Sequence, residues 1–305
     1  MRTVLTGGTG VIGRAAVSAL LDAGHDVVVV TRSQYGSAVV ERLGATSVPG
    51  DVLELESLNT AYAGADAVIN LATKMPVGHG SLRPGAWRHH DRLRTTGVAN
   101  VVEAARAAGV RRVVQESLSI LYADQGDRWI TEQSPLDITR MTEPAAVGES
   151  IVQDYTCGSR AGVVLRFATI VGDDRQTRYW LRATASRRRV GIGHPADWAH
   201  VIHTDDLGGA VLAALHAPTG VYNVGADPVR RHDLLQGYAD VARVEIGAFM
   251  GAWGRWINRE RLEPQCRSLR VSSDHFASQT GWRATRPTFD VGWLDVATTL
   301  HDLRR

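Results

Sequence analysis

The sequence predicts an α/β protein in which a doubly wound parallel sheet carries a smaller C-terminal lobe. Three observations predict this fold. The chain opens with a short apolar strand pattern that runs into a glycine-rich turn and then an amphipathic stretch. Apolar runs alternate with helical stretches over the first two thirds of the chain, as they do in βαβ units. The run 27–30 is four valines, as expected of a parallel strand covered on both faces.

The individual elements follow from the same patterns. Strands are expected at 2–6, 26–31, 46–49, 67–71, 112–116 and 163–167, and helices between them at 11–23, 37–43, 54–63, 88–108 and 144–156. After about residue 170 the pattern loosens, and we expect a helix at 204–217, a strand at 221–224 and a helix at 231–243. Alternating strands and helices of this kind form the Rossmann arrangement.

The glycine-rich turn Thr6–Gly13 has the spacing T-G-x-x-G-x-x-G. Gly7 can take the tight turn, Gly10 lets backbone N–H groups approach phosphates, and Gly13 lets the helix pack close to the strand. A bound pyrophosphate would then lie at the positive end of the helix dipole. The turn therefore predicts a dinucleotide site, with an ordinary glycine-rich turn as the alternative.

This site suggests a division of the chain. We expect residues 1–170, with 201–225 returning to them, to form the dinucleotide-binding domain. Residues 171–200 and 226–305 would form a substrate-binding lobe over the carboxyl edge of the sheet, where doubly wound folds bind ligands.

Composition narrows the class of protein. The 305 residues are 44% hydrophobic, which is enough for a substantial core, and the net charge of +2 gives no reason to expect nucleic-acid binding. Two cysteines make no disulfide framework, no signal peptide precedes the first strand, and no apolar run approaches ~18 residues. We expect a cytoplasmic monomer or homodimer without membrane contact. His200 and His203 have no third ligand at a sensible spacing, so no metal site is expected.

Several motifs together resemble the extended short-chain dehydrogenase/reductase family, in its epimerase/dehydratase-like branch. They are Thr6–Gly13, Gly50-Asp51-Val52, Asn70-Leu71-Ala72, Leu165-Arg166-Phe167 with Val171-Gly172, His203-Thr204-Asp205-Asp206, Val221–Gly225 and Gly281-Trp282. The resemblance implies that Asp51 and Val52 lie beside the adenine, and that Leu71, Ala72 and Thr73 follow the ribose and nicotinamide.

The end of the second strand bears on which nicotinamide cofactor is used. NAD-binding members of the family place an acid there, whereas this chain has Thr31, Arg32 and Ser33. Arg32 can bind a 2′-phosphate with two N–H groups, and Arg14 can add a second cation, so NADPH is predicted. The alternative is that Arg32 stacks on the adenine without preferring a phosphate. The expected cofactor contacts are Thr6, Gly7, Thr9, Gly10, Val11, Ile12, Gly13, Arg14, Arg32, Ser33, Asp51, Val52, Leu71, Ala72, Thr73 and Lys74.

The family's catalytic Tyr–Lys pair is missing. None of the seven tyrosines has Lys or Arg four residues later, and Lys74 is the only lysine. When Glu149 is aligned with the acid that usually follows this motif, Met141 falls at the tyrosine position and Ala145 at the lysine position. Pro144 lies between them and is tolerated only in a first turn, so this helix should begin near residue 143.

The usual catalytic serine is also displaced. Aligned on Tyr122, the serine position holds Leu118, flanked by Ser117 and Ser119. Ser117, Ser119 and Tyr122 are therefore the candidate proton donors, with water or a hydroxyl of the substrate itself as alternatives. Both serines could equally be strand-end hydroxyls that bond to backbone.

Aromatic residues suggest a flat substrate. Tyr179, Trp180, Trp198 and Trp253 lie in segments that the family uses around its substrate cleft, although any of them could instead belong to the core of the lobe. Atypical members that tailor aromatic polyketides, the angucyclinone ketoreductases, also lack the Tyr–Lys pair. The resemblance therefore implies an NADPH-dependent ketoreductase for a polycyclic aromatic ketone. The alternatives are a non-catalytic NADP-binding sensor and, ranked lower because it needs the tyrosine, a nucleotide-sugar epimerase or dehydratase.

Overall fold

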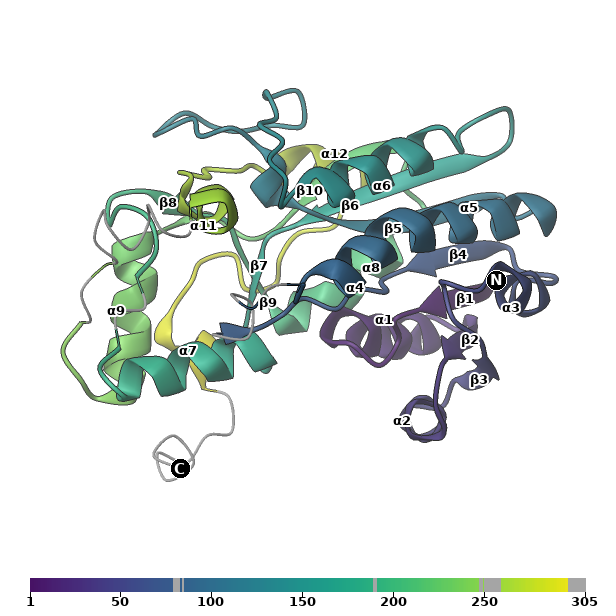
Figure 1. Cartoon of the computed structure of the whole chain (residues 1–305), viewed down its shortest axis with the longest axis horizontal. Helices are drawn as coiled ribbons and strands as arrows, with labels where there is room; N and C mark the ends of the chain where they lie inside the picture. Colours follow the sequence, from purple (N-terminus) through teal and green to yellow (C-terminus); the bar gives the residue numbers. More distant parts are fainter. Residues whose placement is uncertain (79–82, 84, 189–190, 247–248, 250–258, 296–305) are drawn as a thin grey trace.

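A computed structural model of the chain describes residues 1–78, 83, 85–188, 191–246, 249 and 259–295. Its centre is a seven-stranded sheet in the order β10-β6-β5-β4-β1-β2-β3, in which every neighbouring pair is parallel (Figure 1). The strands are β1 (Arg2–Thr6), β2 (Asp26–Thr31), β3 (Thr46–Pro49), β4 (Ala67–Asn70), β5 (Arg112–Leu118), β6 (Ala161–Phe167) and β10 (Gly220–Val224). The predicted fold class is thereby confirmed.

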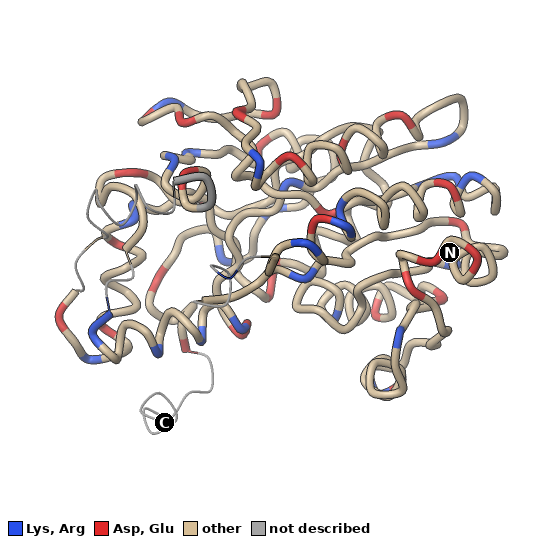
Figure 2. Tube along the Cα trace, in the orientation of Figure 1, with Lys and Arg blue, Asp and Glu red and all other residues tan. Residues whose placement is uncertain are grey.

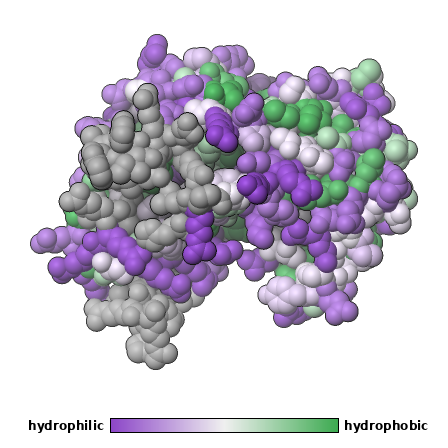
Figure 3. All heavy atoms as spheres, viewed as in Figure 1, coloured by the Kyte–Doolittle hydropathy of each residue, from purple (hydrophilic) through white to green (hydrophobic). Residues whose placement is uncertain are grey.

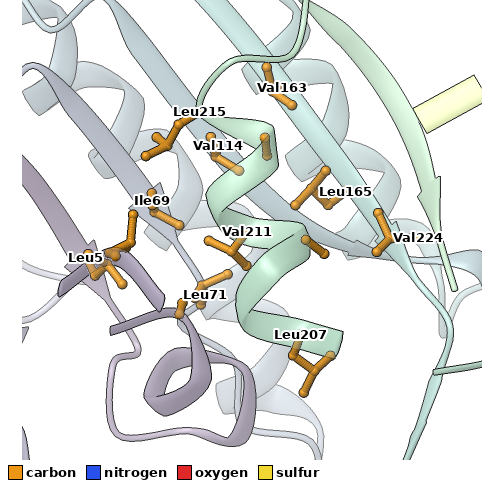
Figure 4. Packing of buried hydrophobic residues seen from close by; sticks show 14 of the residues in the cluster. Leu5, Ile69, Leu71, Val114, Val163, Leu165, Leu207, Val211, Leu215 and Val224 are labelled. Atoms are coloured by element: carbon orange, nitrogen blue, oxygen red, sulfur yellow. The ribbon is translucent and has the colours of Figure 1, made fainter. Parts of the chain in front are cut away.

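Helices cover both faces of this sheet. They are α1 (Val11–Asp22), α2 (Gln34–Arg42), α3 (Leu55–Ala61), α4 (Arg88–Arg92), α5 (Val98–Ala107), α6 (Glu143–Gln153) and α8 (Leu207–Ala214). One hydrophobic core joins α1 and α8 to the sheet, and Figure 4 shows Leu207 and Val211 of α8, with Leu215 just after it, packed among residues of the strands. A second core joins α3, α5 and α6 to the opposite face.

The valine run of β2 shows why such strands are continuously apolar. Val27 and Val29 belong to the first core, whereas Val28 and Val30 belong to the second. Successive side chains of a strand point to opposite faces, so a strand with helices on both sides needs apolar residues at every position.

Most of the remaining elements lie beyond the carboxyl ends of the strands, whereas α12 packs against β10. They are β7 (Thr169–Val171), α7 (Arg175–Ala185), β8 (Trp198–Ala199), β9 (Val201–His203), β11 (Val229–Arg230), α9 (Arg231–Ala242), α11 (Arg259–Cys266) and α12 (Asp274–Thr280). β7 pairs with β9, β8 pairs with β11, and α7 packs against α9 (Figure 1). A third core, which includes Leu181, Tyr238 and Trp293, lies among these elements.

Several predicted boundaries were wrong, each for a local reason. α2 begins at Gln34 rather than 37 because the Ser33 side chain accepts a hydrogen bond from the Gly36 N–H and caps the helix. The helix predicted at 88–108 contains a π-helical turn, η2 (Leu93–Gly97), between α4 and α5. The helix predicted at 204–217 is shorter, because Thr204–Asp206 form a 3₁₀ turn and α8 starts only at Leu207.

The start of α6 was predicted well: the helix begins at Glu143, with Pro144 in its first turn. The long helix α7 was not predicted at all. Its sequence, RQTRYWLRATA, contains three arginines, which make the apolar face of the helix hard to recognise. The clearest sequence signal for the helix is Asp174, whose carboxylate caps it by accepting hydrogen bonds from the N–H groups of Gln176 and Thr177.

The surface carries both signs of charge. Acidic and basic residues are interspersed along the trace in Figure 2. On the face drawn in Figure 3, hydrophilic residues predominate and apolar residues gather in smaller patches. Among the described residues, no helix combines the length and the apolar character that a membrane crossing requires.

Candidate functional site

A cavity of about 790 Å³ runs along the carboxyl ends of the central strands, beside the glycine-rich turn and α7. All sixteen residues predicted to contact a cofactor line it. They are Thr6, Gly7, Thr9, Gly10, Val11, Ile12, Gly13, Arg14, Arg32, Ser33, Asp51, Val52, Leu71, Ala72, Thr73 and Lys74. Residues from four separate segments of the chain therefore meet in one space.

The glycine-rich turn fits a pyrophosphate. Gly7 has φ of +78°, and a Cβ there would lie 2.5 Å from the carbonyl carbon of Leu71. A Cβ on Gly13 would lie 2.2 Å from the carbonyl oxygen of Gly7, so the helix can approach the strand this closely only with glycine at that position. Gly10 caps α1 without any side-chain hydrogen bond, which leaves N–H groups of the first turn available for an anion.

The end of the cavity beside β2 carries Arg32 and Ser33, with Gly36 next to them. The carboxylate in this region belongs to Asp51, after β3, and not to the end of β2. Its Oδ2 lies 3.7 Å from Nη1 of Arg32, and its Oδ1 accepts a hydrogen bond from the Leu53 N–H. The arginine is about half exposed, so its guanidinium can reach a second anion while this weak ion pair persists.

At the carboxyl end of β5 the cavity wall is mostly apolar. Leu118 and Met141 both line it, so the residues at the family's serine and tyrosine positions reach the cavity but carry no acid. Ala145, at the lysine position, is buried on α6 and is not among the lining residues. Ser119 also lines the cavity, is 2% exposed, and its hydroxyl forms no hydrogen bond with the described part of the chain.

Glu116 is the buried carboxyl on this wall. Both of its oxygens accept from Nη2 of Arg94 at 2.8 Å, and Nε of Arg94 donates to Nε2 of His90. Burial raises the pKa of Glu116, and the Arg94 guanidinium opposes that rise. This pair was not predicted, and its only signal in the sequence is an acidic residue soon after the two valines of the strand.

Two of the three candidate proton donors lie outside the cavity, which corrects the prediction for Ser117 and Tyr122. The Ser117 hydroxyl donates to Glu149 Oε1 at 2.5 Å. The Tyr122 hydroxyl donates to Asn223, the ring lies under Arg166, and burial raises the phenol's pKa. Strand alternation explains the outcome for Ser117, because Glu116 and Leu118 line the cavity and the residue between them faces the other way.

The aromatic predictions divide in the same way. Tyr179 and Trp180 of α7 line the cavity, as does Trp87 before α4. Trp198 does not: its indole N–H donates to Asp127 and its ring packs under Arg230 and Arg270. Trp253 lies outside the described residues.

Residues 3–225 match the model of the NAD dependent epimerase/dehydratase family. The chain belongs to this family. Membership supports an enzyme of the oxidoreductase type with a nicotinamide dinucleotide cofactor, and the cavity described above is the candidate site for it.

Relatives within the family include reductases and epimerases. The chain is similar to a 3-diazoavenalumate denitrifying reductase from a Streptomyces species, with 30% identity over 96% of this chain and 99% of that one. A Stigmatella aurantiaca ketoreductase of a farnesyl-dihydroquinoline oxide is 34% identical over 41% of this chain and 35% of its own length. The solved UDP-glucose 4-epimerase from Bifidobacterium longum, in complex with NAD⁺ and UDP, shares the fold: TM-score 0.76, 19% identity, 96% of each chain covered.

The helix at the cavity's edge is held by a buried ion pair. Arg166 on β6 donates to both oxygens of Glu149 on α6, at 2.9 Å and 2.6 Å, and both side chains are about 5% exposed or less. We expect Glu149→Gln to lower the free energy of unfolding by about 3–5 kcal/mol, because it leaves a buried guanidinium without its counter-charge. Urea denaturation measures this loss.

The matched control is Glu103→Gln, which neutralises an exposed glutamate 4.0 Å from Arg106 on α5. This variant should change stability by about 0.5 kcal/mol or less. Equal losses in the two variants would contradict the role given to Glu149.

Proposed function

We propose that this protein is an NADPH-dependent ketoreductase that reduces a ketone on a polycyclic aromatic substrate. The observation that carries the proposal is the wall at the carboxyl end of β5. There Leu118 and Met141 stand at the family's serine and tyrosine positions, while the dinucleotide cradle at the other end is complete. In this family's reductases the reduced cofactor donates a hydride. The chain keeps the residues that would hold this cofactor and lacks the usual acid.

The residues of the cavity can still assist such a reaction. Ser119 can donate its unused hydroxyl hydrogen to the carbonyl oxygen as negative charge develops there. Tyr179, Trp180 and Trp87 supply aromatic surface that can hold a flat ring system against the cofactor. The alcohol oxygen then takes its proton from water or from a phenol beside the ketone, which balances the hydride added at carbon.

A sugar nucleotide is a poorer fit. Epimerisation and dehydration in this family depend on a tyrosine base, and none of the seven tyrosines is followed by Lys or Arg four residues later. A non-catalytic sensor would not need a cavity lined by aromatic residues beyond the dinucleotide cradle.

A second candidate is reduction of a diazo compound. The relative that aligns over nearly the whole chain is a diazo-compound reductase, and hydride addition to an aryl diazonium ion releases N₂ and leaves the arene. This reaction forms no alkoxide, so it needs no acid, and the apolar wall formed by Leu118 and Met141 suits it equally well.

The deciding experiment incubates the full chain with NADPH and a panel of polycyclic aromatic ketones, some with a phenol beside the ketone, and follows cofactor oxidation and product mass. We expect a gain of two hydrogens with a phenolic ketone. A parallel panel of aryl diazonium compounds is assayed for released N₂, which would favour the second candidate. NADPH binding without turnover of either panel would overturn both and leave the sensor.

The role of Ser119 is tested by Ser119→Ala. Removing the hydroxyl that we propose donates to the developing alkoxide should lower kcat by about 100-fold with little change in NADPH affinity. Ser117→Ala is the matched control: it should cost stability, because Glu149 loses a hydrogen bond, and leave kcat within about twofold. An unchanged kcat in Ser119→Ala would overturn the role given to this hydroxyl.

Cofactor choice is tested by Arg32→Ala. Losing the guanidinium beside the 2′-phosphate should raise the KM for NADPH by about 10- to 100-fold and leave the KM for NADH unchanged. Arg42→Ala, on the exposed end of α2, is the control and should change neither. If NADH proved the better substrate for the unmodified enzyme, the assignment of NADPH would be wrong.

A further inference from the structure

A smaller chamber of about 150 Å³ continues from the main cavity into the lobe formed by α7 and α9. The two spaces share wall residues, among them Ile120, Trp180 and Ile192, so they adjoin one another. Most of the chamber's wall is apolar, with Leu234, Leu235 and other side chains of the lobe. A space of this volume holds a single aromatic ring.

Three side chains of this wall carry buried polar atoms without hydrogen-bond partners. Thr184 Oγ1, both ring nitrogens of His200 and Nε of Arg231 form no hydrogen bond with the described part of the chain. Thr184 and His200 are each 2% exposed. Buried polar groups in folded proteins are nearly always paired, and each unpaired one costs free energy. Three in one small chamber, on α7, before β9 and at the start of α9, therefore point to a ligand that pairs them.

The charges in the chamber indicate what that ligand carries. The two Nη atoms of Arg231 donate only to backbone carbonyls, of Ile192 and Arg267, and no described carboxylate forms an ion pair with it. Burial lowers the pKa of His200 to about 3, so its imidazole is neutral and offers one donor and one acceptor. Asp197 and Asp124 act on Arg231 through their charge, but neither forms an ion pair with it. A largely buried guanidinium whose hydrogen-bond partners are neutral carbonyls favours an anionic oxygen.

We propose that the chamber binds one aromatic ring bearing a carboxylate or phenolate oxygen, which pairs with Arg231 while Thr184 and His200 bond to the ring's oxygen substituents. This rests on the proposed function in one respect only, namely that the ring is the distal end of the substrate whose reacting group lies in the main cavity. Arg231 and Thr184 are then specificity-determining residues for acidic aromatic substrates.

The test measures equilibrium binding of single-ring probes to the full chain by calorimetry, with and without NADP⁺. Benzoate is the anionic probe and toluene the uncharged ring of similar size. We expect benzoate to bind more tightly than toluene. Thr184→Val and Arg231→Met should each weaken benzoate binding by about tenfold or more while toluene binding changes little. Thr184→Val preserves side-chain shape, so it tests the proposal even if Arg231→Met fails to fold.

Thr3→Val is the matched control, because Thr3 is a fully buried threonine on β1 that shares a hydrogen bond with His25. It should lower Tm and leave benzoate binding unchanged. Thr184→Val should keep or raise Tm, because it removes a hydroxyl that has no partner. Equal affinities for benzoate and toluene, or a loss of Tm in Thr184→Val like that in Thr3→Val, would overturn the proposal.

Neither the binding of the probes nor the change in Tm depends on hydride transfer. Benzoate binding without ketone turnover would retain the chamber and reject the proposed function, and turnover without benzoate binding would do the reverse.

Discussion

The ion pair between Glu149 and Arg166 is the interaction on which the shape of the candidate site's wall depends. It ties α6 to β6, and the hydroxyl of Ser117 ties the same carboxylate to β5. Because α6 begins only at Glu143, fixing this helix also fixes the segment just before it, and Met141 is carried to the cavity wall. In this chain α6 thus anchors the segment that carries Met141.

A second buried pair lies beside the first. Arg94 belongs to the π-helical turn between α4 and α5, and it holds Glu116 on β5. The charge of Glu149 adds to the rise in the pKa of Glu116. Apolar residues of equal volume would often be as stable as such pairs, so stability alone does not explain them. Their directional hydrogen bonds instead set the orientation of two helices against the strands that line the site.

Much of the fold could be predicted from the sequence because strands covered on both faces and a glycine-rich turn leave strong local patterns. The valine run of β2 and the turn at Thr6–Gly13 are of this kind, and the residues that those patterns singled out meet in one cavity. The absence of a tyrosine followed by lysine four residues later can be seen from residue spacing alone, so it could also be predicted from the sequence. The late start of α6 could be predicted as well, from the position of Pro144.

The features that could not be predicted depend on the direction in which a side chain points and on contacts with residues far away in the chain. Ser117 and Ser119 are equally plausible in the sequence, and only strand alternation and the position of Glu149 separate them. Trp198 looks like a substrate contact until Asp127 and two arginines, distant in the chain, are seen around it. The chamber at Thr184 could not be predicted, because the pattern of residue types does not show whether a buried hydroxyl has a hydrogen-bond partner.

These features together favour catalysis by positioning. Losing a general acid costs about 10²–10⁴ in rate, or roughly 3–5 kcal/mol, whereas holding two reactants in contact can supply about 7–11 kcal/mol. A site that lacks the acid can therefore remain active if it holds its substrate firmly. The aromatic wall at Tyr179 and Trp180 and the unpaired polar groups deeper in the lobe are where that binding free energy can arise. The unpaired polar groups lower the stability of the free protein, and a site specialised for holding its substrate would keep them in spite of that cost. Filling the chamber with apolar side chains should accordingly stabilise the protein and weaken its hold on the substrate.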